Sequence, residues 1–385
     1  MFSSRLPWNL EPNRIARALA EKRRLGARLL DLTESNPTRA GFDYPPEIPE
    51  AFADPRMLRY EPAPAGLRES REAVARYYAA RGVAVEPERI LLTASTSEAY
   101  AYVFKLLADP GDEVLVPRPS YPLFEYLAAM ESVKVRSYPL VFYGNWQIDW
   151  DELLAAVTGR TRAVIVVNPN NPTGSFLKRA ELERLTRLAS ERRIALVSDE
   201  VFSDYAFAPD TQRVETVAAV ESGLAFALSG LSKIAGLPQV KLGWIVVSGA
   251  IEERRGASER LEWIADTYLS VGTPVQCAAA RLLRAGESVR RQIRERTQNN
   301  LALAREMVKG TGAGFLPVEG GWYAILQVPR VRTEEERVLE LLERADTLVQ
   351  PGYFFDFPSE AYLVISLLVP GSIFREGLGR VLEFL

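Results

Sequence analysis

The sequence contains no histidine, and its single cysteine is Cys277. These absences exclude Ser-His and Cys-His catalysis, zinc sites built from imidazole or thiolate, CxxC redox motifs and disulfides within one chain. Any proton transfer must therefore use lysine, a carboxylate, tyrosine or a bound cofactor. Cys277 lies in an apolar helical pattern, and we interpret it as a core residue rather than a nucleophile.

Long apolar runs and runs of like charge are also missing. No stretch approaches the roughly 18 apolar residues of a membrane span, and the first ten residues lack the basic and apolar regions of a secretion signal. The net charge is only −3. We therefore expect a cytoplasmic protein that binds neither membranes nor nucleic acid and holds no metal.

The length and the apolar pattern predict the fold class. A chain of 385 residues exceeds one hydrophobic core, so two domains are expected. Short apolar runs alternate with helical patterns, which predicts an α/β fold with a mostly parallel sheet covered on both faces. The expected strands are 90–92, 113–116, 163–167, 194–197, 224–228 and 244–247, and the helices among them are 98–107, 121–130 and 179–192.

The C-terminal third has a different pattern. One long helical stretch covers 274–309, and strand patterns follow at 320–326 and 362–366. These elements predict a smaller α+β domain with the N-terminal arm packed beside it. The expected parts are the arm at 1–44, a large domain at 45–273 and a small domain at 274–385.

Two titratable residues directly follow predicted strands. Lys233 lies in Ser-Gly-Leu-Ser-Lys after the strand at 224–228, where desolvation could lower its pKa and make it a nucleophile and base. The alternative is an ordinary loop lysine. Asp199 ends Val-Ser-Asp, and it could be either an acid partner for a ligand or the N-cap of a helix.

Three more segments at strand ends offer polar or aromatic groups. Ser95, Thr96 and Ser97 stand between a strand and a helix, where backbone N–H groups and the helix dipole can bind phosphate, or where Ser97 simply caps the helix. Asn171 lies in Asn-Pro-Asn-Asn-Pro-Thr-Gly and could donate from its amide, although this composition is also typical of a plain turn. Tyr121 could stack on a ligand or belong to the core.

An amine, an acid, a phosphate site and a neutral donor are what pyridoxal 5′-phosphate (PLP) requires of a protein. All four lie in loops after predicted strands, which is where open α/β sheets bind ligands. The residues therefore predict a PLP site in which Lys233 forms the Schiff base, Asp199 binds the pyridine nitrogen and Asn171 donates to O3′.

Taken in order, these segments resemble the class I and II aminotransferases of PLP fold type I, over nearly the whole chain. The strongest pieces are 166–174, 198–201 and 231–233, with Lys-Leu-Gly-Trp at 241–244 behind them. Each motif alone is modest, but the ordered set is specific. The resemblance implies an enzyme that transfers an amino group from an amino acid to a 2-oxo acid by a ping-pong route.

The resemblance also implies roles for single positions. Tyr60 corresponds to the tyrosine that reaches the cofactor phosphate of the neighbouring subunit, which implies a homodimer. Tyr121 corresponds to the stacking ring, and residues 95–97 correspond to the phosphate loop. Lys241 stands where most members have an arginine, and an ammonium can also bind phosphate, without the bidentate fork.

Two positions depart from the family pattern. Phe202 replaces a tyrosine that donates to O3′, so we expect a higher imine pKa than in tyrosine-bearing relatives. Val364 stands where most members have the arginine that binds the substrate α-carboxylate. Our hypothesis for its substitute is Arg39, because the family places this N-terminal segment over the active site; the alternative is a surface arginine.

Two other functions use the same cofactor. The altered carboxylate position keeps open a carbon–sulfur β-lyase, since the reaction depends on which substrate bond stands perpendicular to the ring. A PLP-binding regulator is the second alternative. Such a protein ordinarily carries a DNA-binding domain, which we do not expect because little sequence precedes Asp31.

Overall fold

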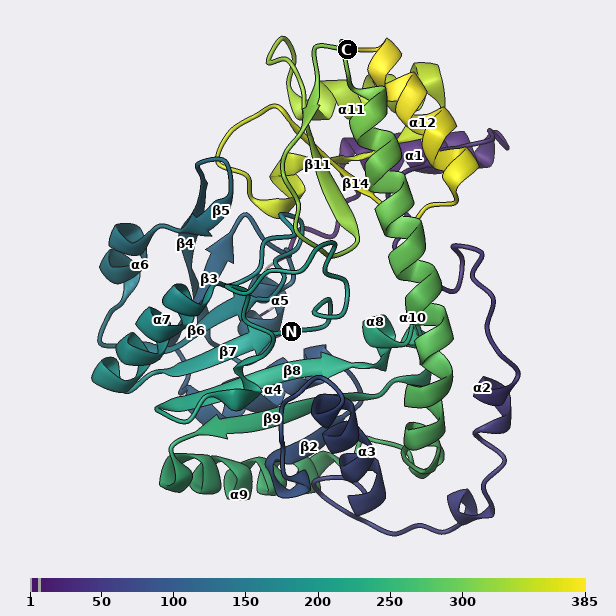
Figure 1. Cartoon of the computed structure of the whole chain (residues 1–385). Coiled ribbons are helices and arrows are strands. Elements are labelled where there is room, and N and C mark those ends of the chain that lie inside the picture. The colour runs from purple at the N-terminus through teal and green to yellow at the C-terminus, as the bar shows by residue number, and fades with distance from the viewer. Residues whose placement is uncertain (1, 6–7) are drawn as a thin grey trace.

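The computed structural model describes residues 2–5 and 8–385, and its centre is a sheet of eight strands (Figure 1). The strand order is β2-β9-β8-β7-β6-β3-β4-β5. β3, β4, β6, β7 and β8 run parallel, whereas β9 is antiparallel to β8 and β2, and β5 is antiparallel to β4. The strands are β2 (Ile90–Thr93), β3 (Glu113–Arg118), β4 (Lys134–Phe142), β5 (Trp146–Ile148), β6 (Thr161–Val167), β7 (Ala195–Asp199), β8 (Leu224–Gly230) and β9 (Gly243–Gly249).

The α/β prediction is confirmed, and each of the six predicted strands overlaps one of the observed strands. Two further strands, β4 and β5, pair at the edge of the sheet and were not predicted. Much of β4 is exposed or only half-buried, so it lacks the continuous apolar run of a strand that is covered on both faces.

Helices cover both faces of this sheet, because successive side chains of a strand point to opposite sides. In β6, Val164 and Val166 belong to the core beneath α3, α7, α8 and α10, whereas Ile165 belongs to the core beneath α4, α5 and α9. The helices are α3 (Arg68–Ala79), α4 (Thr96–Leu107), α5 (Phe124–Met130), α7 (Arg179–Arg192), α8 (Leu231–Ile234), α9 (Ile251–Tyr268) and α10 (Thr273–Met307). The helix predicted at 121–130 is α5, which begins three residues later than predicted, so Tyr121 lies in the preceding loop.

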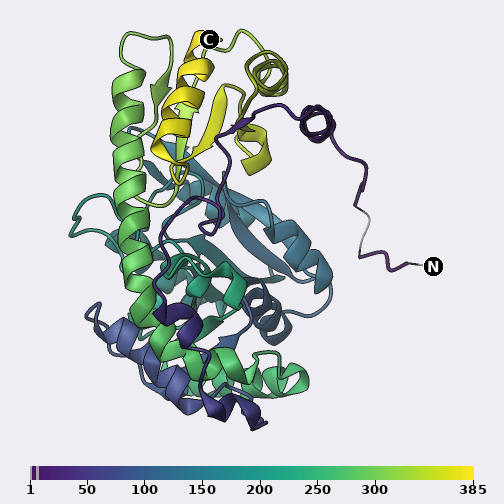
Figure 2. The same cartoon turned by 90° about the vertical axis from the view of Figure 1, so that its right-hand side faces the viewer.

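A smaller unit packs at one end of the large sheet (Figure 2). Its antiparallel sheet has the order β10-β11-β14-β13, and α11, α12 and the C-terminal part of α10 share its core. The elements are β10 (Gly314–Phe315), β11 (Tyr323–Gln327), β13 (Gln350–Pro351), β14 (Tyr362–Ser366), α11 (Glu334–Ala345) and α12 (Gly371–Glu383). The arm joins this unit, since α1 (Arg14–Arg24) makes an ion pair with α11 between Arg14 and Glu335 at 2.9 Å.

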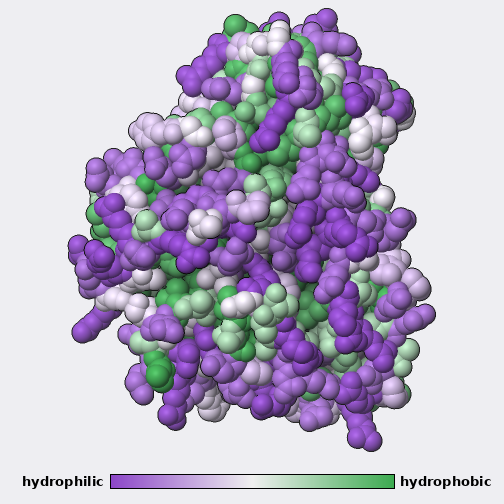
Figure 3. Space-filling model, viewed as in Figure 1, coloured by the Kyte–Doolittle hydropathy of each residue, from purple (hydrophilic) through white to green (hydrophobic). Residues whose placement is uncertain are grey.

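The face in Figure 3 is mostly hydrophilic, with small apolar groups between the charged side chains. Within residues 2–5 and 8–385, no helix combines the length and the apolar character that crossing a membrane requires.

The strand directions decide where functional side chains can meet. β2, β3, β6, β7 and β8 all run in one direction and end at the same edge of the sheet, and the antiparallel β9 begins at that edge. The loops that follow these strands, together with the residues just before Gly243, therefore converge there.

Candidate active site

A cavity of about 180 Å³ opens at this edge of the large sheet. Six of the residues predicted from the sequence line it: Thr96, Ser97, Tyr121, Asn171, Asp199 and Lys233. Its apolar wall is formed by Phe124, Val167, Val201, Phe202 and Leu242, and Ser35 and Tyr323 reach it from the arm and the small sheet. Residues far apart in the sequence are thus brought together around one space.

Lys233 lies in α8, the short helix that follows β8. The hydroxyl of Tyr205 donates a hydrogen bond to its backbone carbonyl at 2.5 Å, which fixes the turn that carries the side chain. The Nζ atom lies 5.1 Å from the ring centre of Trp322 and 5.8 Å from that of Phe202. Burial lowers the pKa of the ammonium, although the nearby Asp199 opposes this shift. The amine is therefore more easily deprotonated than a surface lysine, as a nucleophile requires.

Asp199 is the last residue of β7, and its carboxylate is held from two sides. The Tyr100 hydroxyl donates to Oδ2 at 3.2 Å, and the backbone N–H of Val201 donates to Oδ1 at 3.2 Å. Burial raises the pKa of Asp199 to about 6, whereas these two hydrogen bonds and Lys233 favour the charged form. A cationic ring nitrogen placed beside this carboxylate would lower that pKa again and be stabilised in return.

Asn171 is buried at the cavity wall, and its Oδ1 is one of the buried polar atoms that have no hydrogen-bond partner within the described part of the chain. The neighbouring Asn170 fixes the loop instead, because its Nδ2 donates to the carbonyl of Pro119 at 3.0 Å and to Thr173 at 2.9 Å. A buried amide end without a partner is costly unless a ligand satisfies it. Asn171 can meet a ligand with either end of its amide.

The loop before α4 can bind an anion. Ser95 is the N-cap, since its Oγ accepts from the backbone N–H of Glu98 at 3.2 Å, so the alternative of a cap at Ser97 is wrong. Thr96 and Ser97 therefore occupy the first turn, where backbone N–H groups have no partner within the helix, and both residues line the cavity. Gly243 allows this loop to lie directly on β9, because a Cβ atom there would come within 3.1 Å of the backbone of Ser95.

Four predicted residues do not line the cavity: Ser95, which caps α4, and Tyr60, Arg39 and Lys241. Tyr60 is 77% exposed, and the side chains of Arg39 and Lys241 are also exposed. Ser35, from the same segment as Arg39, reaches the cavity instead. Lys241 adopts a left-handed conformation with φ of 54°, immediately before the cavity-lining Leu242.

Several residues that shape the site are not predicted by the sequence motifs. Tyr100 and Tyr205 hold Asp199 and Lys233, and Trp322 packs beside the lysine. One signal was available in the Gly-Gly-Trp-Tyr segment. A Cβ atom at Gly320 would lie 2.6 Å from the carbonyl oxygen of Tyr205, so this glycine permits a close approach of two chain segments.

These groups fit PLP. A buried amine, a carboxylate with a raised pKa, a helix N-terminus with two hydroxyls and an unpartnered amide all face one cavity. They match the aldehyde, ring nitrogen, phosphate and ring hydroxyl that the cofactor presents. Tyr121, in the same wall, offers a ring that could stack on it.

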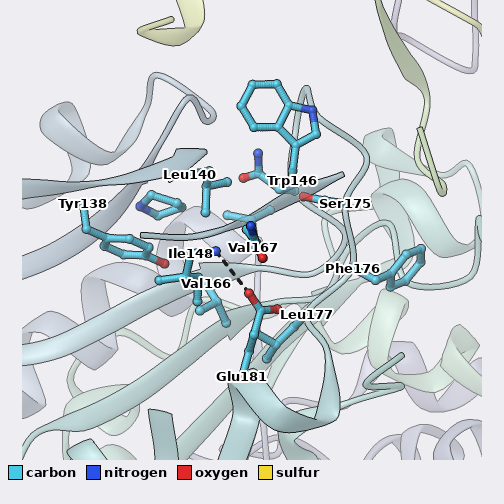
Figure 4. Close-up of a pocket in the computed structure, with 13 residues that line it drawn as sticks. Tyr138, Leu140, Trp146, Ile148, Val166, Val167, Ser175, Phe176, Leu177 and Glu181 are labelled. Carbon is cyan, nitrogen blue, oxygen red and sulfur yellow. Dashed lines mark hydrogen bonds between the residues drawn. The ribbon is translucent and has the colours of Figure 1, made fainter. Parts of the chain in front are cut away.

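A second, smaller cavity lies between β5, β6 and α7 (Figure 4). Its carboxylate is that of Glu181, which accepts from the backbone N–H of Ile148 at 3.1 Å and from that of Lys178 at 3.0 Å. Glu181 thus helps to cap α7 and to fix β5. This space of about 30 Å³ has room for little more than a water molecule.

Glu200 follows Asp199 and is a buried acid outside the cavity lining. It is 1% exposed, its Oε1 accepts from the backbone N–H of Val217 at 2.8 Å, and its Oε2 is among the unpartnered buried atoms of the described residues. Burial raises the pKa of Glu200 to about 7, against hydrogen bonds and Arg81, which lower it. The folded protein therefore retains a proton that the unfolded chain releases near pH 4.5.

Glu200→Gln is expected to stabilise the apoprotein at pH 8 by about 1–3 kcal/mol. The folded wild-type protein binds the extra proton below its folded pKa, so stability is lost as the pH rises from about 4.5 through about 7. Glutamine cannot ionise, so the gain should shrink toward zero near pH 4.5. Urea unfolding at several pH values measures this, with the exposed Glu221→Gln as the control; an effect of equal size at every pH would contradict it.

Comparisons with known proteins agree with this geometry. The family model described as aminotransferase class I and II matches residues 27–368. Glutamate-pyruvate aminotransferase AlaA of Escherichia coli K12 is 28% identical over 357 residues, which cover 88% of this chain and 87% of the relative. Tyrosine aminotransferase of Bos taurus is 27% identical over 377 residues, which cover 92% and 82%. The solved structure of alanine aminotransferase from Pyrococcus furiosus superposes with a TM-score of 0.90 at 25% identity, covering 100% of this chain and 99% of that one.

Proposed function

Because this chain belongs to the class I and II aminotransferases, which are PLP-dependent transaminases, we propose that its cavity transfers an amino group from an uncharged amino acid to a 2-oxo acid by a ping-pong route. The observation that carries the proposal is the meeting of Lys233 and Asp199 in one cavity at the carboxyl edge of the sheet. The relatives are named as aminotransferases, so the lyase and regulatory alternatives are not favoured.

PLP, when bound, withdraws electrons from the substrate α-carbon and thereby makes its proton acidic. Lys233 Nζ would bind the cofactor covalently and then carry this proton as base and acid, for which its lowered pKa is suited. Asp199 would hold the ring nitrogen in its protonated form. Thr96, Ser97 and Lys241 would bind the phosphate, with Ser95 capping the helix below it, and Asn171 would donate to O3′.

The substrate class is inferred from the walls of the cavity and from the relatives. Phe124, Val201 and Phe202 give the wall an apolar character that suits an uncharged side chain. The names of the relatives mention glutamate, pyruvate, alanine and tyrosine. We expect alanine or an aromatic amino acid as a donor and pyruvate or another small 2-oxo acid as an acceptor.

The active unit is proposed to be a cytoplasmic homodimer. Tyr60 is 77% exposed within one chain, which leaves its hydroxyl available to the cofactor phosphate of a partner subunit. The boundaries 1–44, 45–273 and 274–385 are proposed for the arm and the two domains, and α10 is shared between the cores of the large and small domains.

The experiment that tests the function is a panel of amino donors added to the holoprotein. We expect alanine or aromatic donors to change the absorbance of the bound cofactor in a half-reaction, and pyruvate to reverse the change. Borohydride reduction followed by peptide mapping should place the cofactor on Lys233. A holoprotein that responds to no donor, or a label on another residue, would overturn the proposal.

Phe202→Tyr is expected to lower the pKa that the absorbance of the bound cofactor reports. Phe202 lies in the cavity wall, so a hydroxyl added there can donate to the ring oxygen and favour its ionised form. A spectral titration of both proteins measures the shift. Phe357→Tyr, outside this cavity, is the matched control; a rise of the pKa in Phe202→Tyr would contradict the expectation.

A further inference from the structure

The charge of the cavity leaves the substrate carboxylate without a cation. Among the described residues that line it, Lys233 is the one cationic side chain and Asp199 the one anionic side chain, and no arginine is present. Both are committed to the cofactor under the proposed function, on which this inference rests. An amino acid still brings an α-carboxylate into the cavity, and this group needs hydrogen-bond donors.

The strand β14 cannot supply such a cation from position 364. Val364 is fully buried and belongs to an apolar cluster with Trp146, Ile325, Phe355 and Phe357. Burial of an unpaired anion or cation among such side chains would be costly. The substrate carboxylate must therefore be bound at another part of the wall.

Tyr323 is the first residue of β11, and it lines the cavity together with Ser35 and Tyr121. Its ring contacts Phe202 edge-on at 6.3 Å and Phe355 in a tilted arrangement at 6.5 Å between ring centres. Burial raises the pKa of Tyr323 to about 12, while the nearby Ser35 acts in the other direction. The phenol therefore stays protonated, and it remains a donor over the whole physiological pH range.

Ser35 is placed beside it by a separate set of contacts. Ser366, which pairs with Tyr323 in the small sheet, donates from its Oγ to the carbonyl of Glu34 at 2.7 Å. The backbone N–H of Ser366 also donates to the carbonyl of Leu32 at 2.7 Å. One residue of β14 thus fixes both the strand of Tyr323 and the segment of Ser35, so the two hydroxyls are positioned together.

We propose that the hydroxyls of Tyr323 and Ser35 bind the α-carboxylate of the substrate through uncharged hydrogen bonds. They act as specificity-determining residues and bind the carboxylate in place of a cationic side chain. Hydrogen bonds to a charged group commonly contribute a factor of about 10 to 100 in affinity. Each hydroxyl should therefore matter for ligands that carry a carboxylate, and little for those that do not.

The test compares ligands with and without a carboxylate on the holoprotein and on Tyr323→Phe, Ser35→Ala and the double variant. Propanoate is the carboxylate probe, and its dissociation constant is measured by calorimetry. The half-reactions of L-alanine and of ethylamine are followed by cofactor absorbance. Tyr353→Phe, a tyrosine outside the cavity lining, is the matched control, and melting curves check that each variant is folded.

In each single variant we expect the dissociation constant of propanoate to rise roughly tenfold, and the apparent dissociation constant of L-alanine in its half-reaction to rise by the same factor. The apparent dissociation constant of ethylamine should change little. An unchanged dissociation constant of propanoate would overturn the proposal. An equal loss of apparent affinity for L-alanine and for ethylamine would also overturn it. Failure of the wild-type holoprotein to react with any amino donor would instead overturn the proposed function, while the propanoate measurement would still test these two residues.

Discussion

Lys233→Ala is expected to lower turnover by at least about a thousandfold and to abolish covalent attachment of PLP. A general base contributes about 10²–10⁴-fold by itself, and the loss of the covalent link adds to this. The structure supports a large effect because Nζ lies in the cavity, and burial lowers the pKa of the amine. Steady-state kinetics, together with the absorbance of the bound cofactor, measures both losses.

A second lysine provides the control for this substitution. Lys309 lies after the end of α10, is solvent-exposed, and pairs with Glu306 at 2.7 Å. Lys309→Ala should keep wild-type turnover and the wild-type spectrum. Turnover within tenfold of wild type in Lys233→Ala would show that another group performs the proton transfer. This result would contradict the assignment of Lys233 as the catalytic base and acid.

Asp199→Ala is expected to lower turnover by about 10²–10³-fold while PLP still binds to Lys233. The carboxylate would no longer hold a proton on the ring nitrogen, so the ring would stabilise negative charge on the substrate less well. The hydroxyl of Tyr100, which donates to this carboxylate at 3.2 Å, cannot replace it, because a hydroxyl carries no charge.

Rescue distinguishes this role from a structural one. PLP methylated on its ring nitrogen carries a permanent positive charge, so it should restore much of the turnover of Asp199→Ala but not that of Lys233→Ala. Asp266→Ala, on the exposed face of α9, serves as the control and should leave turnover unchanged. No rescue, with cofactor binding intact, would indicate that Asp199 shapes the cavity rather than controls the ring charge.

The sequence predicted most of the large sheet because its central strands are buried on both faces. Runs such as Ala-Val-Ile-Val-Val at 163–167 have few other interpretations once they alternate with helices. The site residues that end these strands could also be predicted, since parallel strands place their carboxyl ends at one edge. Asp199 and Lys233 met in the cavity for this reason.

The parts that escaped prediction depend on contacts between distant segments. Tyr205 donates to the carbonyl of Lys233, and Ser35 lines the cavity together with Lys233 although the two are far apart in the sequence. Neither Tyr205 nor Ser35 lies in a motif that predicts these positions. The exposed Arg39 illustrates the same limit, because a segment can be assigned to a site more easily than one side chain within it. Directions of side chains follow from packing, which a single sequence encodes only indirectly.

The long helix α10 has a consequence for how the protein loses its structure. Leu282 and Val289 of this helix pack in the core of the large sheet, whereas Leu301 and Ala304 pack in the core of the small one. The backbone hydrogen bonds of α10 therefore run without a break from one core to the other. If one core unfolds, its part of α10 loses its packing, and this destabilises the part that the other core requires. Heat should thus dismantle both parts in one cooperative transition rather than in two separate steps.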